Sequence, residues 1–293
     1  MKKIVIATRG SKLALWQSEH IKAELLKINP DLDIHLKIVV TTGDKILDKP
    51  LADIGGKGLF IKEVEDELLN GNAQIAVHSL KDFAVEFDEE HFDLTAITKR
   101  EDVRDTFLSE KYETIADLPE GSVVGTSSAR RIMQLKDLRP DLKIQDLRGN
   151  VDTRIRKLKE GQYDAIILAR AGLKRLGFLG SVKYATAIDT DIMIPAMGQG
   201  ALGIETNKDP EIMELVKKLE DKETRICTTI EREFVRELNL GCHAPVGIKA
   251  KILEDGNVRV KAVLLKGNEI IRKEIISDEF DGLGIKFAEE FKW

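Results

Sequence analysis

The chain has 293 residues, with 46 lysines and arginines against 51 aspartates and glutamates, which gives a net charge of −5. A hydrophobic fraction of 42% with 33% charged residues is typical of a folded globular protein and excludes disordered and fibrous classes. The acidic balance argues against a general nucleic-acid binder, because phosphate binding needs a net basic face. At roughly 150 residues per domain, two or three domains fit this length.

The number of cysteines and the length of the apolar runs indicate in which cellular compartment the protein works. The two cysteines, Cys227 and Cys242, are too few for a disulfide scaffold or a four-cysteine zinc site. The first apolar run, residues 4–7, ends before Arg9 and is shorter than the roughly 7–15 apolar residues of a signal peptide. No stretch approaches the roughly 18 apolar residues of a membrane span. We therefore expect a cytoplasmic protein without membrane or nucleic-acid partners and without a metal site.

Strands alternate with helices in the first hundred residues. The expected elements are a strand at 4–7, a helix at 13–26, a strand at 34–41, a helix at 60–69 and a strand at 73–78. This alternation predicts βαβ units and a largely parallel sheet with helices on both faces.

The same pattern starts afresh near residue 100. It predicts strands at 123–124, 143–147 and 165–168, helices at 130–138 and 151–158, and then an extended stretch at 201–205 with a helix at 210–219. That last segment could rejoin the first sheet, which would place two crossovers between two α/β lobes. From residue 223 the pattern changes to a helix, three β-rich runs (246–253, 258–265 and 269–276) and a final helix at 280–291, typical of an α+β domain.

The segment Gly198–Gly203 has the spacing G-x-G-x-x-G of a dinucleotide-binding turn. Such a turn needs a strand before it and a helix after it. Here residues 204–207 continue as an extended pattern and Pro195 lies just upstream, so we favour a crossover that uses the backbone freedom of glycine. A nicotinamide-dependent enzyme stays a weaker alternative.

Hydroxyl side chains and arginines gather where strands end and helices begin. Arg9 and Ser11 occupy the first such turn, residues 126–131 (TSSARR) the equivalent turn of the second unit, and Arg148, Arg154, Arg170 and Arg175 follow later strands. Because ligands of open α/β sheets bind at the carboxyl ends of strands, this pattern predicts a pocket for a ligand with several carboxylates or phosphates. Helix capping by Ser11 and surface salt bridges to Asp137, Asp146 and Asp152 are the alternatives.

The segment His78–Asp82 closes the strand at 73–78. We expect Asp82 to be a buried, ionised acid that faces the cationic pocket and can stabilise a developing cation or pass a proton. We expect His78 to be a structural hydrogen-bonding residue. Cys227 shares a helical face with Ile230 and Phe234 and is predicted to be core, whereas Cys242 lies in a loop where a thiol can be nucleophilic.

The ordered set of motifs resembles one family. The motifs are RGSKLA at 9–14, TGD at 42–44, GGKGLF at 55–60, HSLKD at 78–82, GTSSARR at 125–131, LRGNVDTR at 147–154 and GC at 241–242. Together they resemble the porphobilinogen deaminase (hydroxymethylbilane synthase) family from Arg9 to Gly247. The resemblance implies a monomeric transferase of tetrapyrrole (haem) biosynthesis that joins four porphobilinogen units head to tail, releases ammonia at each step and frees hydroxymethylbilane with water.

The resemblance also implies a fold and its division along the chain. Two periplasmic-binding-protein-like α/β lobes, 1–98 with 199–218 and 99–198, would be joined by two crossovers, and a smaller C-terminal α+β domain, 219–293, would carry the anchoring cysteine. A two-lobed binding protein for a small polyanion is the main alternative, and Cys242 argues against it.

The site residues implied by the resemblance fall into four groups. Cys242 would hold a dipyrromethane cofactor through a thioether, and Asp82 would stabilise positive charge and shuttle a proton. The cofactor-binding residues would be Lys81, Thr126, Ser128, Arg130, Arg131 and Arg148, the substrate-binding residues Arg9, Ser11, Gln17, Arg154 and Arg175, and the active-site loop residues Lys57 and Phe60. The chain departs from the family pattern at Phe83-Ala84, where a proline is usual, and beside Cys242, at Leu240 and His243.

Overall fold

The computed structural model describes residues 3–42, 61–241 and 244–292. The chain divides into two compact units. Unit 1 comprises Met1–Arg100 and Ala201–Ile226, and unit 2 comprises Glu101–Gly200 and Cys227–Trp293.

Unit 1 is built on a mixed five-stranded sheet. Its strands are β1 (Lys3–Arg9), β2 (Asp33–Val39), β3 (Ile75–Ser79), β4 (Phe92–Ile97) and β10 (Leu202–Asn207). Their order is β2-β1-β3-β10-β4; β1 pairs in parallel with β2 and β3, and β10 pairs antiparallel with β3 and β4. The segment after residue 200 therefore rejoins the first sheet, as the sequence predicted.

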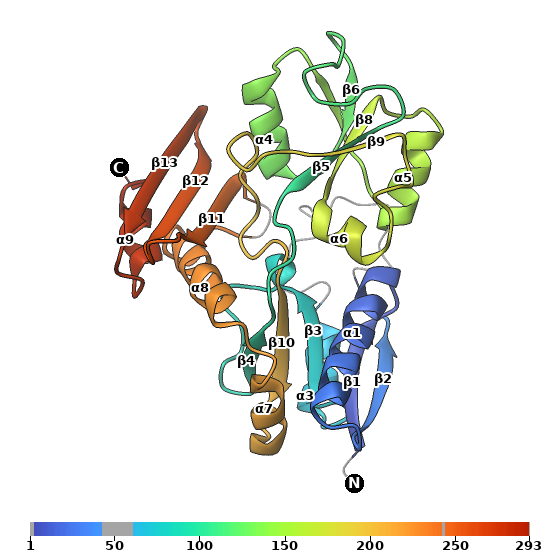
Figure 1. Ribbon diagram of the computed structural model, residues 1–293, viewed down its shortest axis with the longest axis vertical. Helices are drawn as coiled ribbons and strands as arrows, with labels where there is room; N and C mark the ends of the chain where they lie inside the picture. Colours follow the sequence, from blue (N-terminus) through green and yellow to red (C-terminus); the bar gives the residue numbers. More distant parts are fainter. Residues whose placement is uncertain (1–2, 43–60, 242–243, 293) are drawn as a thin grey trace. The chain divides into compact units, whose positions relative to one another are not determined.

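Helices cover both faces of this sheet (Figure 1). Helix α1 (Lys12–Ile28) packs Ile21 and Leu25 on one face, together with Ile212 and Val216 of α7 (Pro210–Lys217). Helix α3 (Lys62–Leu69) packs Val64 and Leu68 on the opposite face, against Ala76 of β3. Both β1 and β3 are buried between helices, which explains their nearly continuous apolar sequences.

The α/β part of unit 2 repeats this arrangement. Its strands are β5 (Asp105–Ser109), β6 (Val123–Gly125), β7 (Lys143–Gln145), β8 (Ala165–Ala169) and β9 (Tyr184–Ala187), in the order β7-β6-β8-β5-β9. Strand β6 is parallel to β7 and β8, and β5 is antiparallel to β8 and β9. Helix α4 (Ala129–Leu138) packs on one face, and α5 (Val151–Lys159) and α6 (Arg170–Arg175) pack on the other.

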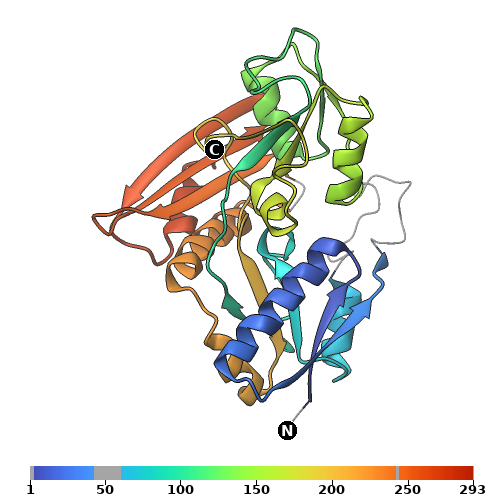
Figure 2. The same cartoon turned by 45° about the vertical axis from the view of Figure 1, so that its right-hand side comes forward.

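The C-terminal part of unit 2 is an antiparallel meander of β11 (Val246–Ile252), β12 (Val258–Lys266) and β13 (Glu269–Ser277), drawn in orange and red in Figure 2. Helices α8 (Lys222–Glu237) and α9 (Leu283–Glu289) accompany it. Phe234 of α8 contacts Phe287 and Phe291, with ring centroids 5.5 and 5.1 Å away. The expected fold class, two α/β lobes linked by two crossovers and a smaller α+β domain, is confirmed.

The meander is joined to the second α/β lobe by α8. The buried carboxylate of Glu231 accepts hydrogen bonds from the N–H of Gly198 (2.7 Å) and from the N–H of Ala250 (2.9 Å). Met133 of α4, Ile194 and Val263 of β12 also share one apolar cluster. These contacts explain why both parts belong to a single unit. Within the described residues, no helix is both long and apolar enough to cross a bilayer.

Candidate functional site

One edge of the unit 1 sheet gathers several of the predicted site residues. Because β1 and β3 are parallel neighbours, their carboxyl ends meet at this edge. Arg9 ends β1, and the Ser11 hydroxyl accepts a hydrogen bond from the N–H of Ala14 (3.3 Å), so Ser11 caps α1. Lys81 and Asp82 lie in a short 3₁₀ turn, η1 (Leu80–Asp82), that directly follows β3.

Three hydrogen bonds fix the η1 turn. The Gln17 amide donates to the Ser79 hydroxyl (2.8 Å), the N–H of Leu80 donates to the Ala201 carbonyl (3.0 Å), and the N–H of Phe83 donates to the Leu80 carbonyl (3.2 Å). Gln17 is only 3% exposed, so its amide nitrogen supports the turn from α1. The turn is therefore held from two directions, by α1 and by Ala201, the residue before β10.

The expectation that Asp82 is buried is wrong, because its side chain is exposed. In a 3₁₀ turn the side chains at positions i and i+3 eclipse each other. Leu80 and Phe83 occupy these positions and are both fully buried, so the residue between them faces solvent. Asp82 is thus presented at the surface of its unit on a turn with an apolar base.

The predicted structural role of His78 is confirmed. Its Nε2 lies 2.9 Å from Oε2 of Glu205, a fully buried carboxylate on β10. A second acid, Glu65 of α3, is half-buried, and burial together with the charge of Glu205 raises its pKa to about 7. Neither glutamate is among the predicted site residues, because the partners that distinguish each of them lie far away along the chain.

The corresponding edge of the second sheet carries the hydroxyl turn after β6. Thr126 is buried, and its hydroxyl accepts a hydrogen bond from the N–H of Ser128 (3.3 Å). Ser127, which was not singled out, donates its hydroxyl to the Leu147 carbonyl (2.7 Å) and accepts from the N–H of Leu147 (3.0 Å). This clamp joins the turn after β6 to the segment that leads into Arg148.

Arg130 and Arg131, at the start of α4, both bind Asp105 of β5. Nη1 of Arg130 lies 2.7 Å from one Asp105 oxygen, and Nη2 of Arg131 lies 2.7 Å from the other. All three side chains are buried, with exposures of 5%, 7% and 0%. Burial lowers the pKa of Arg130. Burial alone would raise the pKa of Asp105, but the two guanidiniums hold that pKa well below its usual range.

The Arg130–Arg131–Asp105 cluster has an excess of positive charge. Among the described residues, two guanidiniums share one carboxylate, so one buried positive charge has no ionic partner. Because a buried charge is costly unless it is paired, this cluster fits an anionic ligand. Asp105 is not among the predicted site residues; its signal in the sequence is an aspartate that directly precedes Thr106, Phe107 and Leu108.

Three other predicted arginines, Arg148, Arg154 and Arg175, have individual partners in unit 2. Arg148 Nε lies 2.7 Å from Asp146, Arg154 Nε donates to the Gly149 carbonyl (2.7 Å), and Arg175 donates to the Gly200 carbonyl (2.7 Å). Burial lowers the pKa of Arg175 to about 10. The salt-bridge alternative thus holds for Arg148 with Asp146, whereas Asp137 pairs with Arg272 of β13 (3.0 Å).

The glycine-rich segment at 198–203 is a crossover. Gly198 and Gly200 have φ values of 65° and 94°, which side chains disfavour, and the chain then enters strand β10. The predicted extended continuation is confirmed, and the helix that a dinucleotide-binding turn requires is replaced by a strand.

Four residues of interest lie outside the described residues: Cys242, His243, Lys57 and Phe60. Cys227 is buried in the core, as predicted. Within the described part of the chain, no group of three or more His, Cys, Asp or Glu side chains is placed to hold a metal ion.

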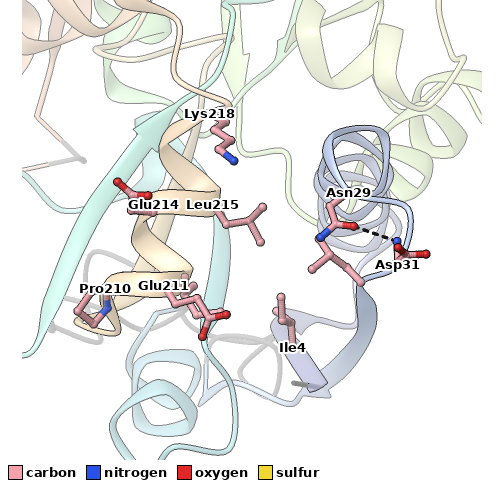
Figure 3. Close-up of a pocket in the computed structure, with 10 residues that line it drawn as sticks. Ile4, Asn29, Asp31, Pro210, Glu211, Glu214, Leu215 and Lys218 are labelled. Carbon is pink, nitrogen blue, oxygen red and sulfur yellow. Dashed lines mark hydrogen bonds between the residues drawn. The ribbon is translucent and has the colours of Figure 1, made fainter. Parts of the chain in front are cut away.

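A separate pocket lies in unit 1 between the end of α1 and α7 (Figure 3). Asn29 and Asp31 line one side, and Glu214 and Lys218 are among the residues of α7 that line the other. Ile4 stands at its base, near the start of β1 and away from the strand end that carries Arg9. The pocket contains none of the predicted site residues.

Comparison with known proteins decides the family. The model described as "Porphobilinogen deaminase, dipyromethane cofactor binding domain" matches residues 4–214, and that of the porphobilinogen deaminase C-terminal domain matches residues 225–292. The chain belongs to the porphobilinogen deaminase family. A porphobilinogen deaminase of Sulfurimonas denitrificans is 56% identical over 99% of this chain and 94% of its own length, and one of Nitratiruptor sp. is 57% identical over 98% and 92%.

Two solved structures show a partial likeness to this chain. The BvgS periplasmic VFT2 domain of Bordetella pertussis is 16% identical, with a TM-score of 0.42 over 74% of this chain and 85% of that one. The probable amino-acid ABC transporter extracellular-binding protein ytmK of Bacillus subtilis is 13% identical, with a TM-score of 0.44 over 75% of this chain and 90% of that one.

The cofactor of the porphobilinogen deaminase family is a dipyrromethane, and the matched domain is named for binding it. The described residues of unit 2 fit such a group. Dipyrromethane carries carboxylate side chains, and the Arg130–Arg131–Asp105 cluster supplies a buried positive charge within that matched domain.

Proposed function

We propose that this member of the family makes hydroxymethylbilane by joining four porphobilinogen molecules head to tail, with loss of ammonia at each step, through the residues named below. The observation that carries the site assignment is the pair of buried guanidiniums sharing one carboxylate, because this excess of buried positive charge suits a ligand that carries carboxylates.

The cofactor set lies mainly in unit 2. Cys242 holds the dipyrromethane through a thioether, and its carboxylates are bound by the remaining members of the set: Lys81, Thr126, Ser128, Arg130, Arg131 and Arg148. When bound, the dipyrromethane supplies the pyrrole carbon to which the first substrate unit is joined. Thr126 is already oriented by Ser128, and the Ser127–Leu147 clamp holds the two segments of this set together.

The substrate set provides cations and hydroxyl groups at the carboxyl ends of strands. Porphobilinogen carries an acetate and a propionate, so each added unit brings two negative charges. Arg9 and Ser11 bind such charges at the end of β1, and Arg154 and Arg175 do so in unit 2. Gln17 belongs to the same set and supports it through Ser79. Bidentate hydrogen bonding makes arginine well suited to carboxylates.

Asp82 acts on the reacting pyrrole. Loss of ammonia and the following C–C bond formation place positive charge on a pyrrole nitrogen of the substrate. An ionised carboxylate on the η1 turn stabilises that charge and accepts the proton released when the ring regains aromaticity. Removing one such preorganised group typically costs a factor of about 10²–10³ in rate. Lys57 and Phe60 are assigned to the active-site loop on their sequence motif alone.

We further propose a cytoplasmic monomer. A thioether-forming cysteine must be a free thiol, which the reducing cytoplasm maintains, and one chain supplies every residue of the proposed site. We propose the domains 1–98 with 199–218, 99–198, and 219–293. Size-exclusion chromatography with light scattering tests the monomer, and a dimer would contradict it.

Intact-protein mass spectrometry tests the assignment of the anchor. The purified protein should exceed its sequence mass by one dipyrromethane, Cys242→Ala should lose that increment, and Cys227→Ala, the matched control, should keep it. A native mass equal to the sequence mass, or an increment that survives Cys242→Ala, would overturn the proposal. Asp82→Asn should retain the increment but lose about 10²-fold or more in turnover; turnover close to native would remove Asp82 from its role.

A further inference from the structure

A buried histidine–glutamate pair lies next to the turn that carries Asp82. His78 of β3 lies opposite Gly203 of β10, and Glu205 lies opposite Ala76, so the side chains of His78 and Glu205 project from the same face of the sheet. That face is covered by α3. The Glu205 side chain is 0% exposed and that of His78 is 9% exposed, and 2.9 Å separates Nε2 from Oε2.

Ring contacts extend this pair to the catalytic turn. The ring centroid of His78 lies 5.0 Å from that of Phe83, which lies 5.1 Å from that of Phe87. Phe83 directly follows Asp82, and its N–H donates to the Leu80 carbonyl (3.2 Å), the bond that closes the η1 turn. A continuous series of contacts therefore leads from Glu205 through His78 and Phe83 to Asp82.

Folding stability alone does not explain the buried His78–Glu205 pair. Replacing both partners of a buried hydrogen-bonded pair by well-packed apolar side chains of the same volume can be nearly neutral, so such a pair contributes little to stability. Glu205 also leaves its Oε1 buried without a hydrogen-bond partner among the described residues, which adds a desolvation cost. Local violations of this kind concentrate at functional sites, and the reaction assigned above uses neither side chain.

We propose that Glu205, acting through His78 and Phe83, positions the turn that carries Asp82, so that Glu205 and His78 are positioning residues for the polymerisation reaction. The proposal rests on the proposed role of Asp82. A carboxylate that stabilises a developing charge must be held in one place, since a displacement of about 1 Å costs up to about 10²-fold in rate. Asp82 is exposed among the described residues, and the buried aromatic base of its turn supplies the packing that holds the turn.

Steady-state kinetics of the cofactor-loaded enzyme test this proposal. Glu205→Leu removes the acceptor for His78 and should lower kcat about tenfold or more, with KM within about twofold of native. Glu205→Gln retains an acceptor oxygen and should recover kcat to within about threefold. Glu65→Gln is the control for charge alone: it alters a neighbouring half-buried acid that is coupled to Glu205 and His78 only through charge, and it should keep native kcat. Intact mass must show equal cofactor content in all variants.

A double-variant cycle separates positioning from general destabilisation. If Glu205 acts through Asp82, Glu205→Leu should add no further loss of rate in an Asp82→Asn background. Native kcat for Glu205→Leu, or a full additive loss in the double variant, would overturn the proposal. If Glu205→Leu does not fold, Phe83→Leu keeps a smaller apolar side chain at this position, removes the ring contact, and carries the same expectations.

The outcomes distinguish this proposal from the function on which it rests. An inactive Asp82→Asn with a fully active Glu205→Leu refutes only the positioning role. A fully active Asp82→Asn refutes the role of Asp82, and the positioning role with it.

Discussion

Replacing Asp105 with asparagine perturbs the buried charge cluster while keeping the shape of the side chain. In the native protein, Asp105 accepts hydrogen bonds from Arg130 and Arg131 at 2.7 Å and from the Gln199 amide at 3.1 Å. Asparagine loses the negative charge, and its NH₂ group faces a guanidinium, so a donor meets a donor. Both arginines are then buried without a counter-charge.

The expected loss of stability follows from the burial of these groups. Removing one partner of a buried ion pair costs about 3–5 kcal/mol. For a domain of 150–250 residues, 1 kcal/mol shifts the melting temperature by about 2–4 °C, so Asp105→Asn should melt about 6–20 °C below native. Differential scanning calorimetry of the cofactor-loaded and cofactor-free forms measures this shift.

The pH dependence of this loss has a definite sign. The pKa of Asp105 is lowered on folding, so its contribution to stability is present above the unfolded value of 3.8 and is lost as the pH falls through the folded value. The difference between native protein and Asp105→Asn should therefore be equal at pH 6 and pH 8, and should shrink only below about pH 4.

The control is the exposed pair of Arg156 and Glu160, whose side chains are 62% and 42% exposed. Glu160→Gln should cost less than about 0.5 kcal/mol, because exposed ion pairs contribute little. If Asp105→Asn were as stable as Glu160→Gln, the cluster would not be a dry, charge-coupled site, and the reasoning that assigns it to an anionic ligand would fail.

Three further predictions test separate features. The pKa of the half-buried Glu65 is raised from 4.5 to about 7, so ionisation of Glu65 opposes folding as the pH rises through this interval. Glu65→Gln should therefore be as stable as the native protein at pH 4. At pH 8 it should be more stable by about 1 kcal/mol, a value that is discounted for solvent screening and is measured by urea unfolding. Gly149→Ala should cost about 1–3 kcal/mol because φ is 111°, whereas Gly180→Ala, with open space around it, should be neutral; equal effects would contradict a strained backbone. Arg148→Ala should lower the cofactor-loaded fraction or stall elongation, as read by native mass spectrometry, and unchanged loading and turnover would exclude Arg148 from the site.

The parallel strands and their turns were predictable from local sequence. Strands β1, β3, β6 and β8 are apolar runs followed by hydroxyl, glycine or arginine residues, and parallel pairing then brings those residues to one edge of each sheet. The return of the chain to the first sheet was also readable, because an extended pattern follows the glycines at 198–203.

Other features depend on contacts that local patterns do not encode. Strand β5 begins with the fully buried Asp105. Its charge is compensated by Arg130 and Arg131, about 25 residues away along the chain, and local sequence does not reveal this pairing. From the sequence, Glu205 is an ordinary polar residue of a strand. Its role becomes visible only in the fold, where its carboxylate contacts His78. The exposure of Asp82 follows from the 3₁₀ turn, whose buried side chains are Leu80 and Phe83.

The contacts of helix α8 determine which unit of the protein carries the proposed cofactor anchor. Its Glu231 accepts hydrogen bonds from the N–H groups of Gly198 and of Ala250 in the first strand of the meander. In the sequence, Cys242 lies between the end of this helix and that strand. A molecule attached to Cys242 is therefore carried by the same compact body as Arg130 and Arg131. On the proposed assignment, the anchoring cysteine and the two buried guanidiniums belong to one unit, whereas Lys81 and Asp82 belong to the other.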